Sequence, residues 1–126
     1  TWETHKILDP NIQVQATCVR VPVLNGHSEA VFFRVSKEIS REEIIKILEK
    51  TPGLKVLDDP KKGEYPTPVE NAIDSEDVYV GRIRSQNIDD DCWISMWIVA
   101  DNVYGKGAAL NAVQICEELL NRGPLK

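Results

Sequence analysis

The segment Cys18-Val-Arg-Val-Pro-Val-Leu-Asn-Gly-His-Ser28 joins two stretches that both predict β-strands. Residues 13–21 alternate with a period of two, which is typical of a strand. Asn25-Gly26 favours a tight turn, because both residue types tolerate positive φ. Residues 30–35 then predict a second strand, antiparallel to the first. The segment therefore predicts a strand–turn–strand unit near the beginning of the chain.

Arg20 and His27 are the side chains of this unit that are suited to chemistry. The planar guanidinium of an arginine matches a carboxylate or a phosphate through two hydrogen bonds. Histidine exchanges protons readily near neutral pH. An anion clamp and an acid/base on one unit predict a site for a small anionic substrate. A surface arginine and a turn histidine without a ligand remain the alternative, and the spacing alone does not exclude it.

The rest of the sequence predicts an alternation of helices and strands. Ser40-Arg-Glu-Glu43 is a capping box, which places a helix at 40–50. Residues 58–77 follow neither helical nor strand periodicity and predict a long polar connection. Arg122-Gly123-Pro124 is expected to end the last helix. The other predicted elements are helices at 2–8 and 107–120, and strands at 54–57, 78–84 and 92–100 around the acidic turn 89–91.

Packing expectations follow from side-chain spacing. Trp93 and Trp97 share one face of a strand, which is typical of a core or a subunit interface. Cys92 and Cys116 are interpreted as core thiols. Two helical stripes are expected to pack, namely Ile44, Ile47 and Leu48 in the first and Ala108, Asn111, Ala112, Ile115 and Leu119 in the second.

Composition limits the class of protein. Hydrophobic residues make up 42% of the 126 residues and charged residues 28%, which is typical of a globular chain. Fifteen basic and 20 acidic residues give a net charge of −5, which argues against nucleic-acid binding. Three unpaired cysteines favour a reducing, cytoplasmic location. We also expect no metal site, because two histidines and scattered cysteines give no ligand spacing. No apolar run is long enough for a membrane span.

Six segments of the chain, in order, resemble the aspartate-β-semialdehyde dehydrogenase family, and together they cover nearly all of it. They are Glu3-Thr-His-Lys-Ile-Leu8, Ala16-Thr-Cys-Val-Arg-Val-Pro-Val-Leu-Asn-Gly-His-Ser-Glu-Ala30, Tyr65-Pro-Thr-Pro68, Val80-Gly-Arg-Ile-Arg84, Trp97-Ile-Val-Ala-Asp-Asn102 and Lys106-Gly-Ala-Ala-Leu-Asn-Ala-Val-Gln-Ile115.

The resemblance implies an α+β fold. It has a mixed, largely antiparallel sheet with helices on one face, similar to the C-terminal domain of glyceraldehyde-3-phosphate dehydrogenases. Residues 1–104 would form a substrate-binding and dimerisation domain that is incomplete at its start. Residues 105–126 would form a terminal helix that belongs to, and packs on, an NADP-binding domain.

The same resemblance implies an activity. The complete NADP-dependent enzyme would reduce L-aspartyl phosphate to L-aspartate 4-semialdehyde, releasing phosphate, in lysine, threonine and methionine biosynthesis. The chain has no G-x-x-G-x-x-G turn and no Asn-Cys-Thr nucleophile. We therefore interpret it as the carboxyl-terminal portion without the NADP-binding half, and expect it to be inactive alone and to form a homodimer.

Residue roles are also implied by the resemblance. Arg20 matches the arginine that binds the substrate carboxylate, and His27 matches the catalytic acid/base. Gln114 and, less closely, Asn111 match positions near the nicotinamide end of the cofactor, although both could be solvated helix residues.

Other functions stay open. A Cys18–His27 dyad would make the chain a self-contained thiol enzyme. N-acetyl-glutamyl-phosphate reductases share the mechanism, but lack the Arg-Val-Pro-Val and Gly-His-Ser pattern around the histidine. A homologue without the nucleophile, or a module that serves only folding and dimerisation, also fits the sequence.

Overall fold

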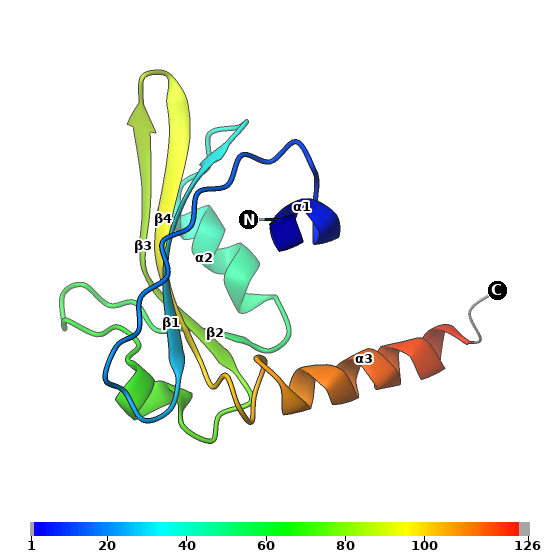
Figure 1. Ribbon diagram of the computed structural model, residues 1–126. Coiled ribbons are helices and arrows are strands. Elements are labelled where there is room, and N and C mark those ends of the chain that lie inside the picture. Colours follow the sequence, from blue (N-terminus) through cyan, green and yellow to red (C-terminus); the bar gives the residue numbers. More distant parts are fainter. Residues whose placement is uncertain (1, 124–126) are drawn as a thin grey trace.

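Four strands with strong β-propensity form a single mixed sheet in the order β1-β4-β3-β2 (Figure 1). The computed structural model describes residues 2–123. Three neighbouring strands are antiparallel, and β2 is parallel to β3. The strands are β1 His27–Val35, β2 Leu54–Val56, β3 Val78–Ile88 and β4 Asp91–Ala100. The helical elements are α1 Trp2–Ile7, α2 Arg41–Glu49, the short π-helix η1 Pro68–Ala72 and α3 Ala109–Arg122. The predicted mixed, largely antiparallel α+β fold is confirmed.

One face of the sheet forms the core with α2. The buried residues Ile44 of α2, Val80 and Ile83 of β3 and Ile94 of β4 pack together. Ser40 caps α2 as predicted, and the side chain of Glu43 accepts a hydrogen bond from the backbone N–H of Ser40. Ile47 was expected to join this face, but it is exposed. Ile45 packs against the core instead.

A buried carboxylate ties α2 to an irregular point in β3. Asp58 accepts hydrogen bonds from the backbone N–H groups of Arg82 at 2.8 Å and Ile83 at 3.0 Å, and from Arg41 at 2.8 Å. The strand register shifts between Gly81 and Arg84, and Arg82 has a φ of 52°. A Cβ at Gly81 would lie 2.3 Å from the carbonyl oxygen of Leu57, so only glycine fits this crossing.

The predicted strand at 13–21 is wrong. These residues form neither helix nor strand, and β1 pairs with β4 instead of with them. An alternating sequence becomes a strand only when its backbone groups find a partner, and none of the described strands pairs with this segment. β1 also begins earlier than predicted, at His27.

The connection at 58–77 is not free of regular structure, contrary to expectation. It contains η1, which Thr67 caps by accepting a hydrogen bond from the backbone N–H of Glu70. The indole N–H of Trp97 donates to the carbonyl of Pro66 at 3.1 Å, so the residues before η1 lie against the sheet face opposite α2.

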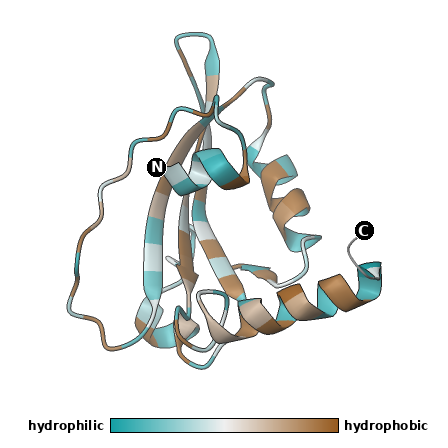
Figure 2. Cartoon of the chain, turned by 45° about the vertical axis from the view of Figure 1, so that its right-hand side comes forward, coloured by the Kyte–Doolittle hydropathy of each residue, from teal (hydrophilic) through white to brown (hydrophobic). Residues whose placement is uncertain are grey.

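The last helix projects away from the sheet (Figure 1), and hydrophobic residues lie along it (Figure 2). In the described part of the chain, α3 packs against no other helix or strand. The predicted stripe is therefore uncovered, with Ile115 and Leu119 exposed, and Cys116 is exposed rather than a core thiol. Residues 1 and 124–126, including Pro124 of the predicted helix stop, lie outside the described residues. Within residues 2–123, no helix has the length and hydropathy required to cross a membrane.

Candidate functional site

His27 is the first residue of β1 and lies opposite Ala100, the last residue of β4. Gly26 precedes it with a φ of 95°, and a Cβ there would lie 3.0 Å from the side chain of Ala72 in η1. The turn therefore needs glycine both for its backbone conformation and for its close approach to η1. His27 follows the Asn25-Gly26 dipeptide directly and so lies at the start of a strand. Its side chain is 56% exposed and so accessible to a ligand.

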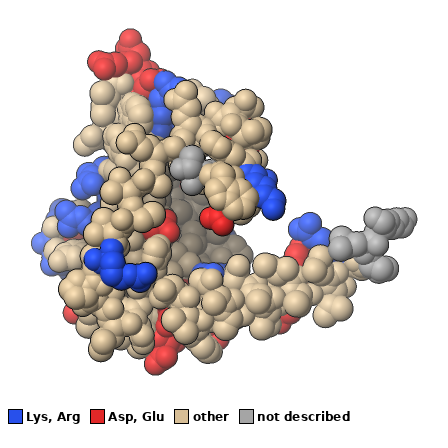
Figure 3. Space-filling view, in the orientation of Figure 1, with Lys and Arg blue, Asp and Glu red and all other residues tan. Residues whose placement is uncertain are grey.

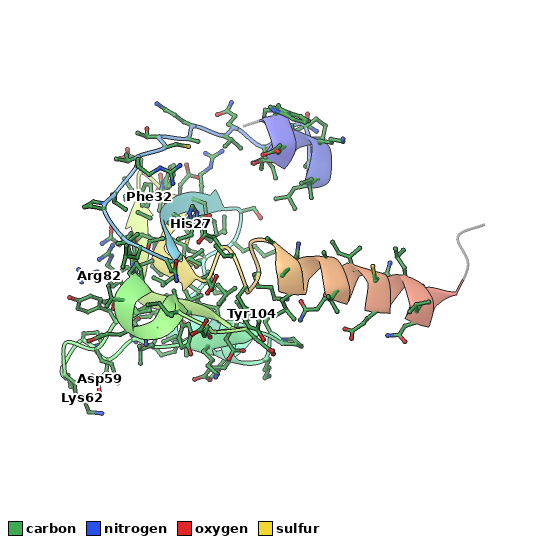
Figure 4. The ribbon with its side chains drawn as sticks, turned by 60° about the horizontal axis from the view of Figure 1, so that its bottom comes forward. His27, Phe32, Asp59, Lys62, Arg82 and Tyr104 are labelled. Carbon is green, nitrogen blue, oxygen red and sulfur yellow. The ribbon has the colours of Figure 1, made fainter. Side chains whose placement is uncertain are left out.

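Glu29 is the hydrogen-bond partner of His27. The Nε2 atom of His27 lies 2.9 Å from Oε1 of Glu29. The two residues are separated by one position on a strand, so their side chains lie on the same face. Glu29 pairs with Ile98 of β4, whose side chain packs against the α2 core. The pair therefore lies on the α2 side of the sheet (Figure 4 labels His27).

Arg20 lies in the unpaired segment 13–21 and is exposed. It makes no hydrogen bond or ion pair with any other residue from 2 to 123. The structure thus brings His27 and Glu29 together, but it does not join Arg20 to either of them. Cys18 is also exposed, and no hydrogen bond connects it to His27 among the described residues.

Asp101 holds the loop between β4 and α3. Its buried carboxylate accepts hydrogen bonds from the backbone N–H groups of Val103 at 2.7 Å, Tyr104 at 2.8 Å and Asp74 at 3.2 Å. The bond from Val103, and then that from Tyr104, lowers the pKa of Asp101 below its ordinary value. A Cβ at Gly107 would lie 2.4 Å from Asn102, so the loop folds tightly on itself. This loop begins beside His27, because Ala100 is the strand partner of His27.

The loop carries Lys106, whose ammonium group donates to Oε1 of Gln114 in α3. Gln114 is half-buried, and the bond leaves both N–H groups of its amide available to a ligand. Asn111 is exposed, and its side chain makes no hydrogen bond with another described residue. Of the two predicted cofactor residues, only Gln114 is therefore held in one orientation.

The three cysteines differ in exposure. Cys92 is buried as predicted, whereas Cys18 and Cys116 are exposed. Over residues 2–123, no three histidine, cysteine or acidic side chains gather in a way that could hold a metal ion.

The opposite face of the sheet carries a different kind of surface. Phe32 of β1 stacks on Trp93 of β4, with ring centroids 4.8 Å apart and an interplanar angle of 13°. Phe32 lies on the edge strand β1 and is 57% exposed, although its ring is stacked on Trp93. The register places Trp93, Trp97 and Phe32 on the face opposite α2. We call the stack of the exposed Phe32 on the half-buried Trp93 the aromatic face.

Sequence reasoning missed three residues of this region. Glu29 could have been found, because a strand puts residue i+2 on the same face as His27. Asp101 had a detectable pattern too, since an aspartate at a strand end often binds the backbone of the next turn. The contact of Lys106 with Gln114 had no sequence pattern, because it depends on how tightly the loop folds.

Comparison with known proteins gives a family and full-length relatives. A family described as "Semialdehyde dehydrogenase, dimerisation domain" matches residues 1–104. An aspartate-semialdehyde dehydrogenase of Legionella pneumophila is 49% identical over 126 residues, covering 99% of this chain and 36% of that protein. One of Aquifex aeolicus is 50% identical over 123 residues, covering 97% of this chain and 35% of that protein. The chain thus spans about a third of the length of the curated relatives it matches.

A solved structure is also similar to this chain. The crystal structure of aspartate semialdehyde dehydrogenase II from Vibrio cholerae complexed with ASA aligns with a TM-score of 0.86 and 45% identity. The alignment covers 95% of this chain and 34% of that one.

Proposed function

Because this chain belongs to the semialdehyde dehydrogenase family and matches its dimerisation domain, we propose that it is the carboxyl-terminal part of an aspartate-semialdehyde dehydrogenase. Such an enzyme reduces L-aspartyl phosphate to L-aspartate 4-semialdehyde with NADPH and releases phosphate. This step belongs to lysine, threonine and methionine biosynthesis. The observation that carries the proposal is the exposed imidazole of His27 at the end of β1, beside the loop that leads to Gln114.

In this role His27 is the acid/base. Its imidazole takes the proton of a cysteine thiol, and it gives or removes the proton on the substrate carbonyl oxygen. None of the cysteines here is bonded to His27, so the thiol belongs to the part of the enzyme outside this chain. Arg20 binds the substrate carboxylate, and its exposed guanidinium makes no hydrogen bond or ion pair with residues 2–123.

The cofactor would meet the beginning of α3. A primary amide that is fixed through its oxygen offers two N–H donors, which fits the carboxamide of a nicotinamide. NADP, when bound, supplies or accepts the hydride. Gln114 would orient its nicotinamide end, with Asn111 as a neighbouring contact. The uncovered apolar side of α3 supports the assignment of residues 105–126 to the nucleotide-binding domain.

The aromatic face is the proposed contact with a second copy of the chain. Exposed stacked aromatic residues are the usual anchors of subunit interfaces. The matched family is described as a dimerisation domain, and Phe32 and Trp93 provide an uncovered aromatic surface on the side of the sheet away from His27.

Phosphate-dependent reduction of NADP⁺ by L-aspartate 4-semialdehyde tests the proposal in the longer polypeptide that carries this chain. His27→Asn is expected to lower kcat/KM roughly 10²- to 10⁴-fold. KM should change little, because Arg20 still holds the carboxylate. His5→Asn is the matched control, since His5 only contacts the carbonyl of Ile12 and should leave the kinetics unchanged.

Two results would overturn this assignment. One is a His27→Asn protein with a lower melting temperature but an unchanged kcat per folded molecule. The other is turnover by the 126-residue chain alone that Cys18→Ser abolishes, which would identify a Cys18–His27 dyad instead.

A further inference from the structure

Glu29 is the one charged side chain bonded to His27 within residues 2–123. Both side chains are more than half exposed, at 56% for His27 and 55% for Glu29. Ion pairs with this exposure contribute little to stability. The contact therefore has no large effect on folding stability. Its consequence is for the tautomer and the orientation of the imidazole.

We propose that Glu29 is a positioning residue that fixes the tautomer and orientation of His27, an inference that rests on the proposed function. An ionised carboxylate accepts hydrogen bonds and donates none. The Nε2 atom that faces Oε1 of Glu29 at 2.9 Å must therefore carry the proton. In the neutral imidazole, Nδ1 then holds the lone pair. Nδ1 is accordingly the atom that accepts the proton from the thiol.

The backbone makes this arrangement persistent. His27 and Glu29 both lie in the ladder between β1 and β4, opposite Ala100 and Ile98. The chain before His27 is held by the close approach of Gly26 to η1. The paired strand therefore fixes the separation of their Cβ atoms on one face of the sheet, independently of any loop. An acid that orients a base through its second nitrogen is the general logic of catalytic triads.

The first measurement is the tautomer of His27 in the 126-residue chain, by NMR of ¹⁵N-labelled histidine above neutral pH. The proposal expects a protonated Nε2 and an unprotonated Nδ1. Glu29→Leu should give a mixture of both tautomers. Glu29→Gln should shift the tautomer population less, since its amide can accept through its oxygen but can also donate through its nitrogen. This measurement does not depend on enzyme activity.

The second measurement is kinetic and uses the longer polypeptide. Glu29→Leu should lower kcat roughly 10- to 100-fold with KM nearly unchanged, and Glu29→Gln should restore part of the loss, because its amide oxygen can accept the same hydrogen bond. In a His27→Asn background, Glu29→Leu should cost nothing further, because it acts only through His27. Glu49→Leu is the control: Glu49 ends α2, is exposed, and has no side-chain partner in the described chain.

The outcomes separate the two proposals. The positioning role would be overturned if Glu29→Leu lowered kcat in the His27→Asn background as much as it does in the wild type. It would also be overturned if Glu29→Leu left kcat unchanged while His27→Asn was inactive. Both results leave the proposed function intact. A wild-type chain with mixed tautomers would overturn it as well. Absence of phosphate-dependent activity in the unsubstituted polypeptide would overturn the proposed function, and the positioning role with it.

Discussion

The side chain of Arg20 makes no ion pair or hydrogen bond with residues 2–123, unlike three other arginines of the chain. Arg34 is paired with Asp91, Arg41 with Asp58 and Arg122 with Glu118. An arginine in an extended segment that no strand pairs with keeps all five of its N–H donors for a ligand. This state suits the clamp that we propose for the substrate carboxylate.

Substitutions that remove the guanidinium of Arg20, or replace it by the single charge of a lysine, should reveal this role. Hydrogen bonds to charged groups are worth about 1.5–3 kcal/mol each, so Arg20→Leu should lower kcat/KM for aspartate semialdehyde roughly 10- to 1000-fold. Arg20→Lys should remain clearly impaired, because lysine cannot bind bidentately.

A substrate without the carboxylate provides the control for Arg20. Wild type should strongly prefer aspartate semialdehyde over 3-aminopropanal, and Arg20→Leu should lose this preference by losing activity only on the former. Steady-state kinetics with both aldehydes measure it. Equal losses on the two aldehydes would show that Arg20 does not contact the carboxylate.

Among the elements, the loop between β4 and α3 depends most on a single side chain. Asp101 accepts three backbone hydrogen bonds there while buried. Asp101→Asn keeps the shape but turns one acceptor into a donor that faces a backbone N–H. We expect it to lower the free energy of unfolding by about 1.5–3 kcal/mol, measured by urea denaturation at pH 7.

The pH dependence of stability gives an independent check on Asp101. Its pKa in the folded chain is lowered, so its stabilising contribution is complete above the ordinary aspartate pKa of about 3.9 and is lost as pH falls through the lower, folded value. The stability difference between wild type and Asp101→Asn should therefore shrink in strong acid. A difference that stays constant down to pH 2 would contradict this.

The elements also show where sequence reasoning succeeds. A capping box names the atoms that bond, so Ser40 and Glu43 fixed the beginning of α2 correctly. Thr67-Pro68 with Glu70 is a similar local pattern, and η1 could have been predicted from it. The alternation at 13–21 specifies two faces but no pairing partner, and this is why the predicted strand failed.

The site was predictable to a similar degree. His27 was placed beside a strand because the Asn25-Gly26 dipeptide interrupts the alternation before it, and Gly26, though not Asn25, has a positive φ. The relation of Arg20 to His27 depended on the strand that did not form. The contact between Lys106 and Gln114 arises from tertiary folding of the loop, which no local pattern encodes.

For the whole molecule, the sheet separates the two proposed functions by its faces. His27 and Glu29 lie on the α2 side, and the aromatic face lies on the other. The acidic turn at Asp89 and Asp90 forms the tip of the β3–β4 hairpin, where acidic side chains gather in Figure 3. Because His27 and the aromatic face lie on opposite faces of the sheet, a partner that covers the aromatic face leaves His27 accessible.

Truncating the aromatic face should dissociate the proposed dimer. Loss of a central aromatic anchor costs at least about 2 kcal/mol, so Trp93→Ala should weaken self-association roughly 30-fold or more. Sedimentation equilibrium of the chain measures it. Phe33→Ala is the matched control, because Phe33 is the neighbour of Phe32 in β1 but lies on the other face of the sheet, and it should leave the dissociation constant unchanged. Dissociation by Phe33→Ala, but not by Trp93→Ala, would place the interface on the α2 side of the sheet instead.

The alternation of β4 also determines which insertions and deletions the gene can tolerate. Because neighbouring residues of β4 serve opposite faces, losing one codon within it would turn Trp93 and Trp97 toward α2 and move Ile94 outward. That single deletion would disrupt both the core with α2 and the aromatic face. Length variation is instead expected at the hairpin tip, where Asp89 and Asp90 are both exposed and adopt positive φ. Among related genes, this strand should change by substitution, while the turn beside it changes in length.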